Sequence, residues 1–342
     1  MLKKYIEKLI NRENLTISEA EAAIEVILNG ADPHQIAAFL VLLRAKKETA
    51  DEILGIVKGM QKSMQKRMVE LNISLPVLDI VGTGGDGANT INISTGAAIL
   101  AASCGVKIAK HGNRAVSSQC GSADVLEALG VNINLSPAKI AQCIEKVGIG
   151  FCFAPNFHPA MKVIRDIRKN LSVPTCFNIL GPLLNPARAK YLLIGVFNEE
   201  LMNLMAEVIL NIGIKKALVF CGNGLDELSC VGCAKVLEVT PSGIKSLILD
   251  PEVFGLARCT VEDLKGGTAK ENAAILQDVF KGKIGPVANT LIFNAAVALY
   301  TYGIAMSIEQ AILHVKKSIN DGKALELLNN FIALSQAGGE RE

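Results

Sequence analysis

Short apolar runs alternate with longer amphipathic stretches along most of the chain. From Pro76 onward the short runs are typical of buried strands, and they read VLDIVG, VKIAKHG, GIGFCFAP, LLIGVFN, KALVFCG and AKVLEVT. Helical periodicity fills most of the intervals between them, as over residues 198–211. Strands that alternate with helices in this way predict an α/β domain built on a mostly parallel central sheet.

The N-terminal part of the chain has a helical pattern with explicit start signals. A hydroxyl or carboxylate residue is followed three positions later by glutamate or glutamine at Thr16 and Glu19, Asp32 and Gln35, and Thr49 and Glu52. The interval 159–188 also breaks the strand rhythm, with a basic helix and the loop LGPLLNP. We therefore expect a small all-helical domain over 1–72, joined by about 160–188, and a larger α/β domain over 73–159 and 189–342.

The stretch IAAFLVLLRAKK, residues 36–47, is more apolar than a single core-facing stripe needs. Two interpretations are open: a large intramolecular core, or a second surface buried against another subunit. On the second interpretation we expect a homodimer formed through the helical domain.

The composition is that of an ordinary soluble, globular protein. The chain has 342 residues, of which 50% are apolar, so it can bury a substantial core. Its apolar runs end well short of the ~20 residues of a membrane-spanning helix, and no signal-peptide pattern opens it. A net charge of +2 without a long basic stripe argues against binding to nucleic acid or to a membrane surface.

The nine cysteines stand in apolar contexts without disulfide-like spacing, which indicates a reducing, cytoplasmic environment. Cys230 and Cys233 form the one CxxC pair. A zinc site would need a second ligand pair at suitable spacing, and a redox motif should open a helix after a strand. Neither context is present, so a structural role is favoured for this pair.

The segment VLDIVGTGGDGANTINIST, residues 77–95, reads as a buried strand, a glycine-rich turn and the start of a helix. Gly82, Gly84 and Gly87 satisfy the dinucleotide-binding pattern GxGxxG, but that site also wants an acidic residue about 20 positions further on. No aspartate or glutamate occurs over 88–123. The loop also lacks the lysine of a P-loop.

A backbone cradle for phosphate is the interpretation that remains for this loop. Glycines let amide groups approach an anion closely, and a helix that begins near Ser94 directs its free N–H groups and positive dipole end to the same place. Asn92 and Thr95 can add further hydrogen bonds. The alternative is a glycine-rich turn with Ser94 as a simple helix cap.

Cations follow the next strand of the predicted sheet. KHGNR comes after VKIA, so Lys110, His111, Asn113 and Arg114 should emerge at the same sheet edge as the glycine loop. Together these groups favour a multiply charged anion as the ligand. His111 is alternatively a core histidine satisfied by backbone groups, and we assign it no proton transfer.

With these motifs in this order, the chain resembles the anthranilate phosphoribosyltransferase family. The resemblance is carried by GTGGDG, NIST, KHGNRAVSS, GSADVLEALG, FAPNFHPAMK, FNILGPLLNP, GLDE and GGTAKENAAIL. Each motif is weak alone, but the ordered set is specific and spans almost the whole chain. The family transfers a phosphoribosyl group from 5-phosphoribosyl 1-pyrophosphate (PRPP) to the amine of anthranilate in tryptophan biosynthesis, releasing pyrophosphate with the help of magnesium.

The resemblance implies a role for residues of every motif. PRPP would be bound by Gly82, Gly85, Asp86, Thr90, Asn92, Ile93, Ser94, Thr95, Lys110, His111, Gly112, Asn113, Arg114, Ser117, Ser118 and Ser122. Anthranilate would be held by Gly82, Asn113 and Arg168. Mg²⁺ would be bound by Ser94, Asp226 and Glu227. Lys110 and Asn113 would be catalytic through positioning and electrostatics, without a dedicated general base.

The chemistry of the side chains agrees with the metal and anthranilate roles. Magnesium prefers oxygen ligands and often uses one or two carboxylates plus substrate phosphates, and Asp226 and Glu227 follow a predicted strand. A plain charged turn is the alternative. Arg168 offers a planar fork suited to a carboxylate. Because Arg165 lies one helical turn earlier, a solvated basic face is the rival interpretation for both arginines.

Three positions depart from the family's usual pattern. Pro174 stands where an arginine is usual, Asn223 lies in a CGNG that replaces a more acidic or histidine-containing version, and Phe157 takes a place often held by tyrosine. The first two put the local geometry in question, and the third concerns the aromatic-substrate pocket. None of them removes a proposed ligand.

The implied reaction is substitution at the ribose C1 through a cationic sugar. The aromatic amine is already neutral near pH 7, so catalysis should rest on positioning and on stabilising the departing pyrophosphate. Two lobes joined near 69–76 indicate closure over the substrates. A nucleoside phosphorylase and a non-catalytic nucleic-acid-binding homologue are the rivals. The carboxylate pair and NIST favour PRPP over the first, and the near-neutral charge with intact motifs disfavours the second.

Overall fold

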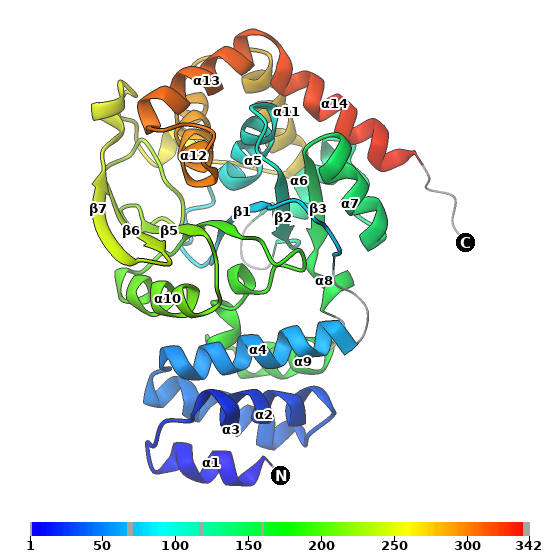
Figure 1. The fold of residues 1–342 in the computed structure, drawn as a ribbon, viewed down its shortest axis with the longest axis vertical. Helices are drawn as coiled ribbons and strands as arrows, with labels where there is room; N and C mark the ends of the chain where they lie inside the picture. The colour runs from blue at the N-terminus through cyan, green and yellow to red at the C-terminus, as the bar shows by residue number, and fades with distance from the viewer. Residues whose placement is uncertain (1, 67–70, 116–118, 159–160, 338–342) are drawn as a thin grey trace.

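The computed structural model describes residues 2–66, 71–115, 119–158 and 161–337. A bundle of N-terminal helices lies below a sheet that carries helices on both faces (Figure 1). The predicted fold class, a small helical domain with a larger α/β domain around a mostly parallel sheet, is therefore confirmed.

The bundle is formed by α1 (Lys3–Ile10), α2 (Ile17–Leu28), α3 (Pro33–Lys46) and α4 (Ala50–Lys66). These helices begin at the predicted signals. Thr16 and Glu19 form a reciprocal capping box at α2, and the Asp32 carboxylate accepts N–H bonds from the first turn of α3. The side chains of Thr49 and Glu52 accept each other's backbone N–H groups at α4.

The sheet contains β1 (Leu78–Gly82), β2 (Ile108–Gly112), β3 (Ile149–Phe153), β4 (Tyr191–Gly195), β5 (Lys216–Cys221), β6 (Ala234–Thr240) and β7 (Gly243–Leu249). Their order is β3-β2-β1-β4-β5-β6-β7. The strands β1 to β5 pair in parallel, whereas β6 pairs antiparallel with both β5 and β7. Each predicted apolar run forms a strand. The sequence pattern misses β7 because most residues of this edge strand are exposed, so it has no buried apolar run.

Successive side chains of each strand enter two different cores. Ile80 and Leu218 belong to the core under the C-terminal helices, whereas Leu192 and Val219 belong to the core shared with the bundle. The first face is covered by α5 (Ile93–Ser103), α6 (Ser122–Ala128), α11 (Ala269–Phe280), α12 (Pro286–Tyr302), α13 (Ile308–Asn320) and α14 (Lys323–Gln336). Among the described residues, no helix is both long and apolar enough to cross a membrane.

Most of the remaining helices and turns lie at the sheet edge or between the sheet and the bundle, whereas the last two turns contact α13 and α12 on the first face. They are α7 (Pro137–Lys146), α8 (Ala154–Phe157), α9 (Lys162–Leu171), α10 (Glu199–Asn211) and the short turns η2 (Cys176–Asn178), η3 (Gly181–Leu183), η4 (Pro251–Phe254) and η5 (Glu262–Leu264). In Figure 1, α10 lies between the sheet and α4, and it contacts both. The helix α9 and the turn η2 pack on α3, whereas η3 contacts β2. The predicted domain boundaries stay a prediction.

The apolar stretch of α3 is largely buried within the chain. Ile36, Phe39, Leu40 and Leu43 are 0% exposed, whereas Val41 is 40% exposed. The intramolecular core therefore accounts for most of this stretch and leaves Val41 on the surface.

Candidate active site

The glycine loop follows β1 at the point where the winding of the sheet reverses. β2 and β3 lie on one side of β1, and β4 and β5 lie on the other. In open α/β sheets, ligands bind at such a switch point, outside the carboxyl ends of the strands. Gly82 and Gly195 end β1 and β4 there, and they are partners in register.

Asp226 lies directly against this pair of glycines. A Cβ at Gly82 would collide with Asp226 Oδ2, and a Cβ at Gly195 would collide with the Asp226 backbone oxygen. No side chain fits at either strand end, so both positions need glycine. The structure therefore brings together the glycine loop and the acidic segment, which the sequence places far apart.

A tight turn after β5 delivers the acidic segment to this place. Gly222 and Leu225 form an antiparallel bridge around Asn223 and Gly224, whose φ angles are 53° and 81°. Positive φ at both central residues is typical of a type I′ turn, in which Asn-Gly is a favoured pair. Asn223, one of the departures from the family pattern, therefore suits the conformation it adopts.

The backbone amides expected to cradle phosphate hold these carboxylates. The Gly84 N–H donates to Asp226 Oδ2 at 2.6 Å, and the Ser94 N–H donates to Glu227 Oε1 at 3.1 Å. Gly84 and Gly85 have φ angles of +72° and +92°, which other residues rarely adopt. Ser94 lies in the first turn of α5, where N–H groups have no partner within the helix. The loop and the helix start thus form an oxyanion-binding site.

Acidic side chains gather at this site with raised pKa values. Burial and the charge of Asp86 raise the pKa of Asp226 to about 7. Burial and the charge of Asp226 raise the pKa of Glu227 to about 8. The described residues contain no cluster of three or more His, Cys, Asp and Glu side chains arranged to hold a metal ion. A carboxylate pair beside a phosphate cradle fits magnesium, which is commonly completed by substrate oxygens.

Lys110 lies in the middle of β2, and its side chain reaches the start of α5. Its Nζ donates to the Ile80 carbonyl at 2.7 Å and to Ser94 Oγ at 3.3 Å. Burial lowers the pKa of this lysine, and attraction to Asp79 and Glu227 opposes that shift. The structure thus brings Lys110 and the predicted magnesium ligands to one end of α5.

His111 points to the opposite face of the sheet, because successive strand side chains alternate. Its Nδ1 lies 3.1 Å from the Gly181 carbonyl, and its ring packs edge-on against His158 with centroids 5.2 Å apart. Burial, reinforced by the charge of His158, lowers its pKa to about 3. This placement favours the interpretation of His111 as a core histidine. A contact between its imidazole and PRPP stays a prediction, which the placement does not support.

The basic turn after β2 is folded onto α6. Ser122 Oγ donates to the Asn113 carbonyl at 3.2 Å. The Arg114 guanidinium is paired with Asp124 and Glu127, so two carboxylates already match its charge. A PRPP phosphate that binds Arg114, as predicted, would therefore compete with these two carboxylates for the guanidinium.

The other predicted PRPP residues have different surroundings. Ile93 is 0% exposed in the core of the sheet, so its backbone alone is available to a ligand. The Thr95 hydroxyl is buried without a hydrogen-bond partner among the described residues. Thr90 forms a bridge with the segment that precedes α11. Ser117 and Ser118 lie outside the described residues.

The structure places Arg168 on α9, at the bundle side of the molecule. Its Nη2 donates to Asn178 Oδ1 at 3.3 Å, and its guanidinium lies 5.8 Å from the centre of the Phe177 ring. Arg165 is exposed beside Asp166. The two arginines therefore differ in burial, and a uniformly solvated basic face describes only Arg165. No hydrogen bond or ion pair among the described residues joins Arg168 to the glycine loop.

The other two departures from the family pattern lie in contrasting environments. Phe157 is 1% exposed and belongs to the core shared with the bundle, where an aromatic ring without a hydroxyl packs without an unsatisfied polar group. Pro174 is exposed between α9 and η2. Neither residue contributes a ligand to the site.

The sequence does not predict a buried polar pair behind the site. Asp79 Oδ2 accepts from Asn185 Nδ2 at 2.7 Å, and Asp79 Oδ1 accepts from the His111 N–H at 3.1 Å. Asn185 Nδ2 also donates to the Ala109 carbonyl at 2.7 Å. These bonds tie the loop LGPLLNP to β1 and β2. An aspartate inside an apolar strand run is the sequence signal that could have revealed it, because buried polar groups need partners.

The CxxC pair does not form a closed site. Cys230 is buried, whereas Cys233 is exposed and its sulfur lies 3.5 Å from Arg258 Nη2. None of the nine cysteines, all of which lie in the described part of the chain, forms a disulfide.

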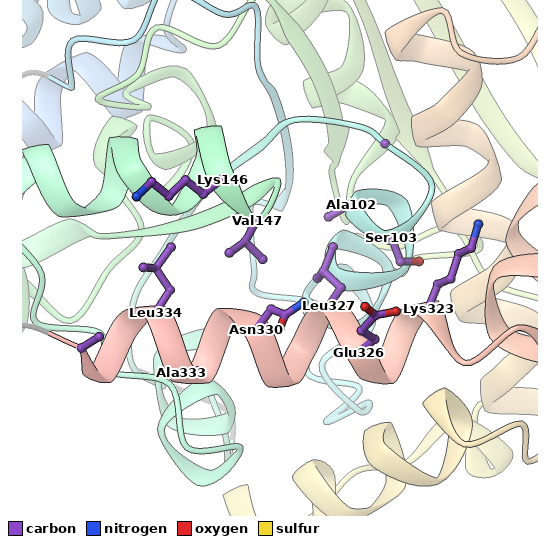
Figure 2. Close-up of a pocket in the computed structure, with 12 residues that line it drawn as sticks. Ala102, Ser103, Lys146, Val147, Lys323, Glu326, Leu327, Asn330, Ala333 and Leu334 are labelled. Atoms are coloured by element: carbon purple, nitrogen blue, oxygen red, sulfur yellow. The ribbon is translucent and has the colours of Figure 1, made fainter.

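A separate hollow of about 710 Å³ lies at the C-terminal end of α5 and is also lined by α7 and α14. Figure 2 shows Lys146 and Lys323 at opposite ends of this hollow, extending away from each other. None of the predicted site residues lines it. The hollow therefore belongs to the end of α5 remote from the glycine loop.

Two family profiles match the chain. Residues 3–64 match a profile described as "Glycosyl transferase family, helical bundle domain", and residues 74–325 match "Glycosyl transferase family, a/b domain". The first profile ends in the last turn of α4, and the second begins just before β1.

Curated relatives and solved structures are similar over nearly their whole length. The anthranilate phosphoribosyltransferase of Chlamydia felis is 48% identical, with 98% of this chain and 97% of the relative covered. The crystal structure of the enzyme of that name from Thermus thermophilus has a TM-score of 0.91 and 39% identity, covering 97% of this chain and 99% of that one. The Saccharomyces cerevisiae enzyme in complex with PRPP and Mg has a TM-score of 0.90 and 31% identity, covering 98% of each chain.

Proposed function

The chain belongs to the anthranilate phosphoribosyltransferase family, and we propose that it transfers the phosphoribosyl group of PRPP to the amine of anthranilate in tryptophan biosynthesis, releasing pyrophosphate. One observation carries this proposal: Asp226 and Glu227 converge on the amides of the glycine loop and α5. A pyrophosphate that binds with magnesium needs amide donors and carboxylates at one place.

PRPP binds along the edge formed by β1, β2 and the start of α5. The backbone around Gly82 and Gly85 and the first turn of α5 donate N–H groups to its phosphates. Lys110 lies beside this turn and offsets the negative charge that grows on the pyrophosphate as it leaves. The donors are fixed by the fold, so little reorganisation accompanies the reaction.

Asp226, Glu227 and Ser94 are the residues that would hold magnesium. The ion would supply positive charge that neutralises the leaving pyrophosphate. The raised pKa values of the two carboxyl groups support this assignment, because a buried acidic pair is stabilised by a cation.

Anthranilate is placed by Asn113 and Arg168, with the backbone at Gly82. The half-buried guanidinium of Arg168 binds the anthranilate carboxylate in a two-point contact, and Asn113 orients the amine. The amine is neutral near pH 7 and attacks the ribose C1 without a strong general base. Positioning of the two substrates therefore supplies most of the rate enhancement.

The proposed function is tested by the fluorescence of anthranilate, which is lost when its amine is substituted. The purified chain is mixed with anthranilate, PRPP and a series of magnesium concentrations, and PRPP is omitted from a control series. We expect loss of fluorescence that depends on both PRPP and magnesium. The proposal is wrong if no concentration of magnesium produces that loss. Consumption of inorganic phosphate with a nucleoside in place of PRPP would instead indicate a phosphorylase.

We also propose that the enzyme is a cytoplasmic homodimer formed through the helical domain. The partly exposed Val41 on α3 and the 60% exposed Ile10 on the bundle support an apolar contact there. The packing of α9 on α3 supports a helical domain of 1–72 joined by about 160–188, against an α/β domain of 73–159 and 189–342. Light scattering of the wild type and a Val41→Glu variant tests the dimer, which should dissociate in the variant.

A further inference from the structure

The segment GGTAKENAAIL has no part in the proposed chemistry, yet it borders the glycine loop. Just before α11 the chain runs antiparallel to the end of that loop. The Ile91 N–H donates to the Leu264 carbonyl at 2.8 Å, and the Gly266 N–H donates to the Asn89 carbonyl at 2.9 Å. This pairing brings α11 against the start of α5.

Asn272 extends this contact through its side chain. The residue lies on α11 and is 1% exposed. Its Nδ2 donates to Asn92 Oδ1 at 2.9 Å, and its Oδ1 accepts from the Gly267 N–H at 2.8 Å. A Cβ at Gly266 would lie 2.8 Å from Asn272 Oδ1, so glycine is required for the amide to fit. The Asn272 side chain is thus fixed from both sides.

Asn92 is the N-cap residue of α5, but its side chain caps no N–H of that helix. Its Nδ2 donates to the Cys120 carbonyl at 3.0 Å, and its Oδ1 accepts from Asn272 Nδ2 at 2.9 Å and from Cys120 Sγ at 3.2 Å. An asparagine at this position ordinarily accepts a hydrogen bond from the second or third N–H of its helix. In this structure the second N–H, that of Ser94, is instead bonded to Glu227.

The bonds to Asn272 and Cys120 therefore hold the Asn92 amide away from its own helix. Without Asn272, Asn92 Oδ1 would keep only the weak thiol donor of Cys120, and an N–H group in the first turn of α5 would then be the stronger donor for it. A capping side chain would then compete with an incoming phosphate for the same N–H groups.

We propose that Asn272 is a positioning residue for PRPP, which prevents the side chain of Asn92 from capping the first turn of α5, where the pyrophosphate would bind. The proposal rests on the proposed function, because it takes PRPP as the ligand of that helix start. Asn272 itself touches neither substrate in this scheme and acts through Asn92.

Steady-state kinetics of Asn272→Ala test the proposal. We expect the KM for PRPP to rise about tenfold, as for the loss of one hydrogen bond to a charged group, while the KM for anthranilate stays within about twofold. Asn272→Asp keeps the acceptor for the Gly267 N–H but lacks the donor to Asn92, so it should also raise the KM for PRPP. It serves as the second variant if the alanine variant folds poorly. Equal increases in both KM values would overturn the proposal.

A double-mutant cycle shows whether Asn272 acts through Asn92. In an Asn92→Ala background, Asn272→Ala should change the KM for PRPP by less than about twofold, because the side chain that it holds is gone. Effects of the two substitutions that multiply would contradict the proposal.

Thr268→Ala is the matched structural control. Thr268 caps the same helix in a box with Glu271 and does not contact Asn92. We expect this variant to lower the melting temperature but to leave the KM for PRPP unchanged within about twofold. If Thr268→Ala raised the KM for PRPP as much as Asn272→Ala does, the effect of Asn272 would be structural and the proposal would be wrong.

A binding measurement separates this inference from the proposed function. Calorimetry with magnesium pyrophosphate should give a Kd about tenfold higher for Asn272→Ala than for the wild type. Absence of turnover in the wild type would defeat the proposed function alone. Equal Kd values in the wild type and Asn272→Ala would defeat the positioning role alone.

Discussion

The Asp226 carboxylate accepts a 2.6 Å hydrogen bond from the Gly84 N–H, although 142 positions separate the two residues in the chain. The bond forms because Gly82 and Gly195 leave space for Asp226 above the ends of β1 and β4. The same N–H groups that suit a phosphate are therefore next to the carboxylates that suit its cation. The glycine loop and the acidic segment are thus adjacent in the fold, although each is a weak sequence signal alone.

Removal of either acidic side chain should weaken the response to magnesium. We expect Asp226→Ala and Glu227→Ala to raise the magnesium concentration needed for half-maximal activity roughly 10- to 100-fold, since a charge-assisted contact contributes about 1.5–3 kcal/mol. The measurement is a magnesium titration at saturating PRPP.

Glu199→Ala is the control for this titration, because Glu199 is an exposed carboxylate paired with Lys235. Its magnesium response should match that of the wild type. An unchanged response in both Asp226→Ala and Glu227→Ala would rule out their role as ligands.

A methyl group at Gly195 should disturb the same contact sterically. The added Cβ would collide with the backbone oxygen of Asp226, so the acidic segment has to move. We expect Gly195→Ala to lose activity at least about tenfold and to lose about 1–3 kcal/mol of unfolding free energy. At Gly181 nothing lies within 4 Å of an added Cβ, so Gly181→Ala should change the unfolding free energy far less. Equal stability of the two variants in urea titrations would refute the steric argument.

The two neighbouring arginines of α9 should differ in their effect on anthranilate. Arg168→Ala should raise the KM for anthranilate roughly 10- to 100-fold and leave the KM for PRPP within about twofold, because a charged carboxylate contact is lost. Arg165→Ala is the matched control, since Arg165 is exposed beside Asp166. An unchanged anthranilate KM in Arg168→Ala would show that another residue binds the carboxylate.

The sequence predicts those parts of the fold that depend on local pattern. Buried strands such as LDIVG appear as apolar runs, and capping pairs such as Thr16 with Glu19 mark helix starts, because both signals lie within a few neighbouring residues. The edge strand β7 escapes prediction because only tertiary pairing with β6 makes it a strand.

The arrangement of the site depends on contacts that no local pattern contains. The sequence places Lys110 and His111 at one sheet edge, but strand alternation sends their side chains to opposite faces. From the sequence, Arg114 is predicted to be a cation available to a ligand, but in the structure its guanidinium forms ion pairs with Asp124 and Glu127 of α6. Buried polar contacts of this kind are set by the packing of distant elements, so they become visible only in three dimensions.

His158 should make the folded chain sensitive to acid. Burial lowers the pKa of His158 from 6.5 to about 4, and its side chain is 7% exposed. Between these two pH values the unfolded chain binds a proton at this position that the folded chain does not. The unfolding free energy therefore falls as the pH is lowered from 6.5 towards 4, by roughly 3 kcal/mol for this one group.

A His158→Gln variant tests this linkage, because glutamine has no proton to take up. We expect the wild type to lose more unfolding free energy than the variant between pH 6.5 and 4.5 in urea titrations, and His34→Gln to behave like the wild type because its side chain is 96% exposed. The raised pKa values of Asp226 and Glu227 act in the opposite direction in all three proteins and cancel from the comparison. The difference between wild type and His158→Gln therefore reports His158 together with its effect on the neighbouring His111. The same pH slope in the wild type and His158→Gln would show that His158 binds its proton equally in both states.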